Sequence, residues 1–357
     1  MRVHELRLVE TDPYRRGQEY GRALAEQVRD SAERYAWAFG ELGVDSDTVV
    51  RVARESFVQL EGWAQTQADE LRGLAAGSGV SLFDLAALTA RTEVLAHAPQ
   101  EAIECSTVVR LADEGPMGIQ TWDWHAELVP DAVLLEANVG GRCVRTFAEV
   151  GMLAKIGMGG NLALFLNILS HERDARGAGV PVHAVARRIL EQADTVEEAF
   201  AIAEGAPLGA STVLTVLEAP SAAKPAGDAA SIELSPAGVA LVRGSGGLLA
   251  HTNHFLDPVL ATGDSASTKS TTDVRLAHLK SVAAPVAAAA EVSELALAMC
   301  GDASAAAPVC MRPADSPNLA DRWQTLITIA MMPGTGELHW HDGIPADVAE
   351  SGFQVFG

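Results

Sequence analysis

The first hundred residues carry apolar positions with the period of an α-helix. One series recurs at steps of three and four residues, with charged side chains between its members, which places the apolar residues on one helical face. Gly43 ends this series, and a Gly-Ser-Gly segment at 77–79 ends the next one. The pattern predicts helices at about 20–39, 48–72 and 82–97. The first series consists of Tyr20, Leu24, Val28, Ala32, Tyr35 and Phe39.

Short β-branched segments replace this pattern near residue 100. Segments 106–111 and 118–124 flank an Asp-Glu-Gly turn at 113–115, which is typical of a β-hairpin. Helices interrupt the later strands and no change of composition marks a linker, so a layered α+β protein with a single domain over residues 1–357 is predicted. The other predicted strands are 132–139, 142–149, 162–169, 211–218, 230–234, 238–243, 325–332 and 337–341, and the other helices are 181–192, 195–204, 272–284 and 291–299.

The chain of 357 residues is acidic and rich in apolar residues. Its 48% of hydrophobic residues suffice for a large core, which excludes a mainly disordered chain. The 26 Lys and Arg against 47 Asp and Glu give a net charge of −21, which repels nucleic-acid phosphates and anionic lipids. No apolar stretch approaches the roughly 20 residues that cross a bilayer. We therefore expect a cytoplasmic protein that binds neither nucleic acid nor membranes.

Cysteine usage draws attention to one residue. Cys105, Cys143, Cys300 and Cys310 form no Cys-x-x-Cys pair, so neither a disulfide framework nor a zinc site is indicated. Cys105 lies where the helical pattern gives way to strands. A free thiol has a pKa of about 8.5 and needs a base to become a nucleophile, and the histidine in this segment is His125. A cut before Cys105 would supply one, because the new α-amine has a pKa of about 7.7–8.0. A buried structural cysteine is the alternative.

Two histidine pairs and one glycine-rich segment contain residue types that can bind a metal ion or a phosphate. His251 and His254 precede an Asp-Pro pair that favours a loop, and His339 and His341 alternate along a predicted strand. The Gly-Met-Gly-Gly segment at 157–160 lacks the spacing of a dinucleotide or phosphate loop. We therefore predict no metal and no other cofactor; a metal-dependent hydrolase that uses the histidine pairs is an alternative.

Several segments together resemble a known family. The most specific are Glu104-Cys105-Ser106, Gln120-Thr121-Trp122-Asp123-Trp124 and Thr252-Asn253-His254-Phe255; the others are 15–21, 70–80, 90–93, 161–167 and 325–332. In this order they resemble the isopenicillin-N acyltransferase (acyl-coenzyme A:6-aminopenicillanic acid acyltransferase) family of autoproteolytic N-terminal-nucleophile hydrolases. The resemblance implies an αββα sandwich of two sheets between helical layers. It also implies self-cleavage into a helical chain, 1–104, and a sheet-rich chain, 105–357.

The resemblance also implies roles for individual residues. The Cys105 sulfur would attack the Glu104 carbonyl during self-cleavage and later form an acyl-enzyme thioester, with the new α-amine as base. Asp123 is expected to hold that α-ammonium group, and Asn253 is expected to donate to the oxyanion. Two arginines, Arg275 and Arg322, are candidates for keeping the thiolate ionised.

Four more residues are expected to bind substrate: Thr121, Trp122, Trp124 and His254. Trp122 and Trp124 alternate with Asp123, so on a strand both point away from it. Core packing is the alternative for both tryptophans.

The family resemblance predicts an amidohydrolase or acyltransferase for small N-acyl amides or acyl thioesters. We favour hydrolysis, because the acidic chain disfavours an anionic donor such as coenzyme A. The alternatives are an acyl-coenzyme A-dependent N-acyltransferase of secondary metabolism and an unprocessed, non-catalytic binding protein. Two departures matter here: Glu104 replaces the family's glycine before the cysteine, and Ser106 replaces its threonine. If the chain is cleaved, we expect the two pieces to remain associated.

Overall fold

The computed structural model describes residues 1–98, 104–129, 131–267, 270–316 and 322–357. Each helix predicted in the N-terminal third is broken in two, at Leu24, Ala64 and Ala90, whose backbone torsions lie outside the helical region. None of these residues is a glycine or proline, so the residue types gave no sign of the breaks. A first strand, β1 (Arg2–Leu8), precedes the helices α1 (Pro13–Ala23), α2 (Ala25–Glu41), α3 (Ser46–Trp63), α4 (Gln65–Ser78), α5 (Leu82–Thr89) and α6 (Arg91–Leu95).

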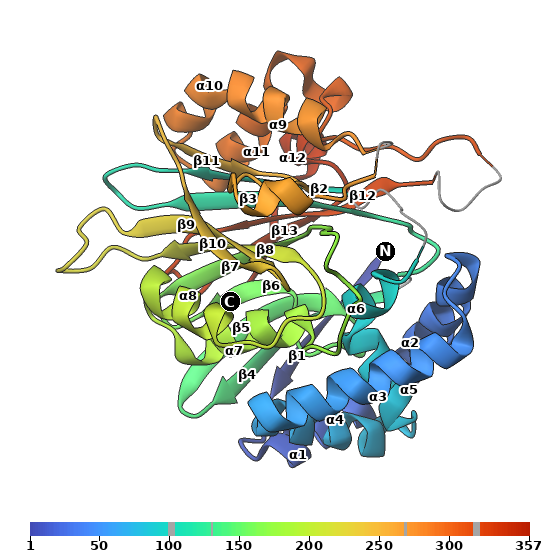
Figure 1. The fold of residues 1–357 in the computed structure, drawn as a ribbon. Helices are drawn as coiled ribbons and strands as arrows, with labels where there is room; N and C mark the ends of the chain where they lie inside the picture. The colour runs from blue at the N-terminus through green and yellow to red at the C-terminus, as the bar shows by residue number, and fades with distance from the viewer. Residues whose placement is uncertain (99–103, 130, 268–269, 317–321) are drawn as a thin grey trace.

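The strands of the described residues form two sheets (Figure 1). The larger has the order β1-β4-β5-β6-β7-β8-β9-β10, in which only β1 and β4 pair in parallel, and the smaller has the order β11-β2-β3-β12-β13-β14. Their bounds are β2 (Glu104–Arg110), β3 (Met117–Trp124), β4 (Asp131–Val139), β5 (Arg142–Glu149), β6 (Ile156–Gly159), β7 (Leu162–Ile168), β8 (Thr212–Glu218), β9 (Asp228–Ser235), β10 (Gly238–Arg243), β11 (Leu248–His251), β12 (Gln324–Met331), β13 (Leu338–Asp342) and β14 (Gln354–Phe356).

Helices cover the outer face of each sheet (Figure 1). The helices up to α8 cover the larger sheet, and α9 to α12 cover the smaller one. Three apolar clusters fill the layers: one under the first set of helices, one between the sheets and one under the second set. The predicted αββα sandwich is confirmed. The later helices are α7 (Val182–Gln192), α8 (Val196–Glu204), α9 (Thr272–Ser281), α10 (Ala283–Ala288), α11 (Val292–Cys300) and α12 (Val348–Ser351).

The β2–β3 hairpin confirms the strongest strand prediction, whereas β1, β6, β11 and β14 are not predicted by the sequence. The missed strands are short or lie at a sheet edge, so they lack a long alternating pattern. The predicted helix 272–284 divides into α9 and α10 at Val282. No helix of the described residues is long and apolar enough to cross a membrane.

Candidate active site

Cys105 and Glu104 are neighbours at the start of β2, yet their side chains enter different layers of the sandwich. In the antiparallel pairing with β3, Cys105 lies opposite Trp122 and Glu104 lies opposite Asp123. Since side chains alternate along a strand, Cys105 and Trp122 enter the apolar layer between the sheets. Glu104 and Asp123 face the helical layer that begins with α9. Trp122 and Asp123 therefore point to opposite faces, as predicted.

Two side chains that are distant in sequence hold the backbone of Cys105. Its N–H donates to Asn253 Oδ1 at 2.8 Å, across 148 residues, and its carbonyl oxygen accepts from Arg275 Nη1 at 2.5 Å, across 170 residues. Arg275 also donates to Ser106 Oγ at 3.0 Å and to Asn253 Oδ1 at 2.9 Å. The structure thus brings Asn253 and Arg275 to the residue that was predicted as the nucleophile.

The Glu104 carboxylate is buried and fully engaged. It accepts hydrogen bonds from the backbone N–H and the hydroxyl of Thr271, at 3.0 and 3.1 Å, and forms an ion pair with Arg275. Burial lowers the pKa of the Arg275 guanidinium to about 9, so the group remains a cation at neutral pH. Glu104 therefore places a carboxylate on the arginine that holds Cys105.

Asp123 is a buried carboxyl group without a cation beside it. Neither of its carboxyl oxygens has a hydrogen-bond partner of good geometry among the described residues. Burial raises its pKa to about 8, although the nearby hydroxyls of Thr325 and Thr121 oppose this rise. Asp123 is therefore mostly neutral at pH 7 and would ionise if a cation arrived next to it.

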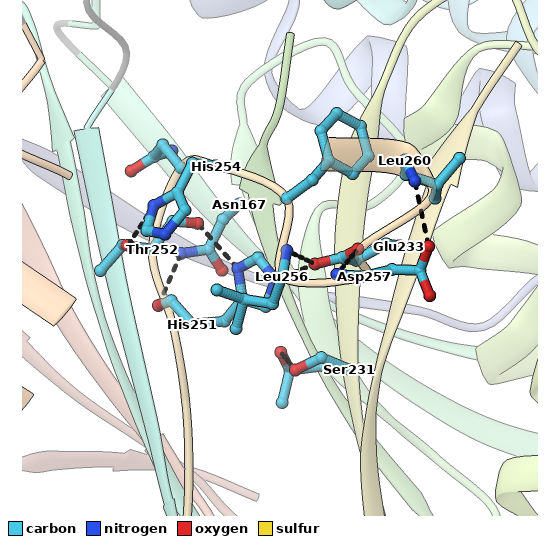
Figure 2. A network of polar contacts seen from close by, with 12 residues as sticks. Asn167, Ser231, Glu233, His251, Thr252, His254, Leu256, Asp257 and Leu260 are labelled. Carbon is cyan, nitrogen blue, oxygen red and sulfur yellow. Dashed lines mark hydrogen bonds and ion pairs between the residues drawn. The ribbon is translucent and has the colours of Figure 1, made fainter. Parts of the chain in front are cut away.

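A buried carboxylate organises the loop that carries Asn253 (Figure 2). Glu233 on β9 lies 2.7 Å from His251 Nε2 and accepts the backbone N–H groups of Leu256 at 2.6 Å and Asp257 at 3.0 Å. His251 and Glu233 are both fully buried. This network is not predicted from the sequence; a carboxylate inside an apolar strand segment was the available signal.

The side-chain amide of Asn253 is itself fixed by the surrounding chain. Its Oδ1 accepts from Cys105 and Arg275, and its Nδ2 donates to the Ile168 carbonyl at 2.9 Å. Its backbone N–H donates to Thr272 Oγ1 at 2.8 Å, and His254 Nδ1 lies at the same distance from that hydroxyl. An amide nitrogen carries two hydrogens, so one N–H of Asn253 is left for a ligand.

The thiol of Cys105 faces two buried cations across the layer between the sheets. Burial raises the pKa of Cys105 to about 12 and Asp123 adds to this rise, whereas Lys155 and Arg91 lower it. Lys155 Nζ lies 3.2 Å from the centroid of the Trp122 ring. Neither cation is predicted as a site residue from the sequence, although Lys155 is a charged residue in an otherwise apolar segment.

A cavity of about 120 Å³ adjoins this site. Its wall includes Trp124, Ile168, His171 and Asp174. Ile168 joins the cavity to the site, because its carbonyl accepts the Asn253 amide. Trp124 is therefore the predicted substrate-binding residue that lines the cavity.

The other predicted substrate-binding residues are placed differently. Trp122 is packed in the layer between the sheets and Thr121 is fully buried on the opposite face, beside Asp123. His254 is half-buried against Thr272. None of these three lines the cavity.

Arg322 is not brought to Cys105. Its Nη1 forms an ion pair with Glu127 Oε1 at 2.9 Å, and both side chains are more than a third exposed. The structure therefore distinguishes the two candidate arginines: Arg275 contacts Cys105, and Arg322 lies at the surface.

The histidine pairs do not converge on common points. His251 binds Glu233 and His254 lies against Thr272. His339 lies 3.4 Å from Glu337, whereas His341 lies 3.2 Å from the Gly352 carbonyl. The Gly-Met-Gly segment forms β6 and pairs with β5 and β7 rather than forming a phosphate loop.

One acidic cluster of the described residues has the spacing of a metal site, but a lysine occupies it. Carboxylate oxygens of Glu197, Glu218 and Asp228 lie within 4.8 Å of one another. Lys224 Nζ contacts all three, at 2.7, 2.8 and 3.0 Å. The ammonium group of Lys224 therefore occupies the position that a metal ion would take.

Solved structures provide a comparison for the fold. The chain resembles an N-acylethanolamine-hydrolyzing acid amidase ortholog from Caenorhabditis elegans at 14% identity, covering 64% of this chain and 93% of that one, with a TM-score of 0.42. A mutant conjugated bile acid hydrolase from Clostridium perfringens shares 13% identity, with coverages of 70% and 92% and a TM-score of 0.42. Penicillin V acylase from Agrobacterium tumefaciens shares 13%, with coverages of 67% and 83% and a TM-score of 0.37. No curated protein sequence matches the chain.

The sequence itself matches one family model. Residues 110–337 match the model described as acyl-coenzyme A:6-aminopenicillanic acid acyl-transferase, a segment that begins after Cys105 and includes Asp123, Asn253 and Arg275. The match covers well over half of the chain. The chain therefore belongs to the acyl-coenzyme A:6-aminopenicillanic acid acyl-transferase family, a family of enzymes of the acyltransferase and amidohydrolase kind.

Proposed function

We propose that this chain is an autoprocessing cysteine amidohydrolase or acyltransferase with Cys105 as its nucleophile. The observation that carries the proposal is that Asn253 and Arg275 both bond to the backbone of Cys105. Both side chains come from segments remote in sequence and bring a neutral amide donor and a cation to this cysteine, the kinds of group that stabilise an oxyanion in acyl chemistry. The family match supports the same class of chemistry.

Self-cleavage begins with attack of the Cys105 sulfur on the Glu104 carbonyl carbon. The bond between this carbon and the Cys105 nitrogen then breaks, and the nitrogen takes a proton and becomes a free α-amine. Water hydrolyses the resulting thioester. The products are residues 1–104, ending in Glu104, and residues 105–357, beginning with Cys105.

The mature enzyme uses the new amine as its general base. An α-amine with a pKa of about 7.7–8.0 accepts the thiol proton at neutral pH and returns it to the leaving group. Asp123 holds the ammonium form, because a buried carboxyl without a partner ionises when a cation appears beside it. The remaining N–H of Asn253 donates to the oxyanion, and Arg275 holds the Cys105 carbonyl group. Lys155 and Arg91 are the cations that lower the pKa of the thiol.

The substrates are small N-acyl amides. The cavity beside Asn253 has one apolar side, formed in part by Trp124 and Ile168, and carries His171 and Asp174. Once the acyl-enzyme has formed, water gives hydrolysis and an amine gives acyl transfer. The net charge of −21 disfavours a strongly anionic acyl thioester as donor, so hydrolysis is the preferred outcome.

The cleaved chains remain one folded unit. Strand β1 of the first chain pairs along its length with β4 of the second. The buried Tyr35 hydroxyl of the first chain donates to Glu149 of the second at 2.8 Å. The apolar cluster under the first helices contains residues of both chains. We therefore expect the two products to purify together under native conditions.

One observation favours a second candidate function, a non-catalytic binding protein that is never cleaved. The Glu104 carboxylate forms an ion pair with Arg275 directly beside the bond to be cut. If that ion pair holds the peptide away from the thiol, the scaffold stays a single chain.

Intact mass measurement under denaturing conditions distinguishes the two. The enzyme gives fragments of 104 and 253 residues from the 357, and the Cys105→Ala variant gives one intact chain. Cys143→Ala is the matched control, because Cys143 is an exposed cysteine of the same chain, and it should cleave normally. A single intact species from the unsubstituted chain would support the binding protein and contradict self-cleavage.

A further inference from the structure

Self-cleavage needs a proton acceptor that differs from the base of the mature enzyme. Before cleavage the Cys105 nitrogen is part of a peptide bond, and its hydrogen is donated to Asn253 Oδ1 at 2.8 Å. An amide nitrogen has no basic lone pair, so the α-amine cannot yet accept the thiol proton. Some other group has to perform this step once in the life of each molecule.

Lys155 lies in the same buried layer as the Cys105 thiol. Its side chain is 1% exposed, and its Nζ lies 3.2 Å from the centroid of the Trp122 ring. Trp122 is the cross-strand partner of Cys105, and both side chains belong to the cluster between the sheets. Lys155 therefore approaches the hairpin on the face from which the thiol projects.

Lys155 is one of two buried cations that share a single carboxylate, Glu149. Glu149 on β5 pairs with Arg91 on α6 at 3.1 Å and accepts the Tyr35 hydroxyl at 2.8 Å, whereas Lys155 Nζ lies farther from Glu149, at 3.5 Å. His183 on α7 also faces this group. The single carboxylate of Glu149 thus pairs with two cations, and the positive charge of the more distant one, Lys155, is only weakly compensated.

This environment prepares Lys155 for proton transfer. Burial lowers its pKa to about 7, with Glu149 opposing and Arg91 adding to the shift. The pKa of Glu149 is lowered to about 2 by Arg91 and Lys155 in spite of its burial. Burial also lowers the pKa of His183 well below its ordinary value, so its imidazole is a weak base. Arg91 does not release its proton at these pH values.

We infer that Lys155 is the proton acceptor for the Cys105 thiol during self-cleavage, an inference that rests on the function proposed above. The neutral amine takes the proton from sulfur as the sulfur bonds to the Glu104 carbonyl carbon. The resulting ammonium returns the proton to the Cys105 nitrogen as the carbon–nitrogen bond breaks. No proton is gained or lost, and Lys155 ends neutral beside the thioester.

The transfer is coupled to the attack on the carbonyl. Since burial raises the pKa of Cys105 to about 12 and lowers that of Lys155 to about 7, a free thiolate is costly in the resting chain. Bond formation to carbon consumes the thiolate as it appears. A slow step is acceptable for a reaction that each molecule performs once.

The test follows cleavage of the full chain made by cell-free translation between pH 5.5 and 9. In the unsubstituted chain the rate should rise as the pH passes through about 7 and then level off, because only neutral Lys155 accepts a proton. Lys155→Met keeps the volume but removes the base, and the rate should fall about 100-fold or more. Lys155→Arg keeps the charge but should be equally slow. Lys280→Ala, at an exposed lysine, is the matched control and should cleave normally.

Chemical rescue separates a base from a structural residue. Lys155→Ala leaves a space for a small primary amine, so added ethylamine should restore cleavage, whereas tetramethylammonium should not. Cleavage of Lys155→Met and Lys155→Ala at the unsubstituted rate overturns the inference and leaves the proposed function intact, provided that Cys105→Ala stays whole. The inference is also overturned if Lys155→Ala cleaves slowly, is not rescued by ethylamine and keeps the pH profile of the unsubstituted chain. A chain that never cleaves overturns both.

Discussion

Each face of the β2–β3 hairpin carries a buried ion pair and, beside it, a buried titratable group whose charge is weakly compensated. On the outer face, Glu104 pairs with Arg275 and Asp123 is left without a cation. On the inner face, Arg91 pairs with Glu149 and Lys155 is left poorly compensated. Each face thus has one close ion pair and one weakly compensated group whose pKa is shifted toward neutrality, to about 8 for Asp123 and about 7 for Lys155.

The difference between the faces lies in the sign of the weakly compensated group. In the proposed mechanism, an acid without a cation on the outer face suits an ammonium group that appears later, and a lysine with only a long ion pair on the inner face suits a proton that has to be removed first. The peptide bond proposed to be cut runs between them, because Glu104 and Cys105 project to opposite sides of one strand. In the proposed mechanism, the hairpin therefore separates the group that acts before cleavage from the group that acts after it.

The largest expected effect comes from breaking the outer ion pair. In a Cys105→Ala background, which keeps the chain whole, Arg275→Met leaves the buried Glu104 carboxylate without its cation. Loss of one partner of a buried pair costs about 3–5 kcal/mol of unfolding free energy, measurable by urea denaturation. Adding Glu104→Gln should recover much of this loss.

The control is Arg51→Met, which removes an exposed ion pair with Glu55 and should cost less than about 1 kcal/mol of unfolding free energy. Equal losses for Arg275→Met and Arg51→Met would contradict the claim that the buried pair stabilises the chain more than a surface pair does.

Asn253 should affect turnover more than stability. Asn253→Ala removes the proposed oxyanion donor, which typically costs about 2.7–4 kcal/mol of transition-state stabilisation, or 100- to 1,000-fold in kcat. The measurement is hydrolysis of an N-acyl amide by cleaved enzyme. Asn138→Ala, at an exposed asparagine near the end of β4 that accepts from the Gly141 N–H, is the control. A variant with normal kcat at position 253 would contradict the oxyanion assignment.

Asp123 should make the uncleaved chain less stable as the pH rises. Folding raises its pKa from 3.8 to about 8, so its contribution is present in full below pH 3.8 and is lost as the pH rises through about 8. Between pH 5 and 8 the loss is about 2–4 kcal/mol, measured by urea denaturation of Cys105→Ala. Adding Asp123→Asn should remove this slope. The cleaved enzyme should lack it too, since the new ammonium lowers the pKa of Asp123; an equal slope in cleaved and uncleaved chains would contradict that pairing.

The smallest effect is expected from the support of the Asn253 loop. His251→Ala leaves the buried Glu233 carboxylate with its two backbone donors but without the imidazole. The cost should be about 1–3 kcal/mol of stability, together with a smaller loss of kcat than Asn253→Ala produces. A kcat loss as large as that of Asn253→Ala would mean that His251 itself takes part in the chemistry.

The sequence predicted the layers of the fold better than the site. The 106–111 and 118–124 segments were recognisable because β-branched residues flank a clear turn, and the hairpin is confirmed. Helix breaks such as the one at Ala64 were not, because tertiary packing rather than residue type sets them. Cys105 was singled out by its position between the helical and strand patterns, whereas Asp123 and Asn253 were selected by resemblance, which also left Arg275 and Arg322 as equal candidates.

The rest of the site depends on contacts that no local pattern records. Glu149 ends β5 and Lys155 lies six residues later, just before β6 of the same sheet, whereas Arg91 comes from α6. The approach of these charges to Cys105 depends on how the larger sheet stacks on the smaller one. Glu233 reaches His251 from the other sheet. A charged residue in an apolar segment signals that a partner exists, but it does not say which one.

The most direct test of the account is to sequence the N-termini of purified protein that hydrolyses an acyl amide. Self-cleavage before Cys105 should give two sequences in equal amounts, one from Met1 and one beginning Cys-Ser-Thr at residue 105. Active protein with Met1 as its sole terminus would contradict the claim that Cys105 acts through an amine on its own backbone.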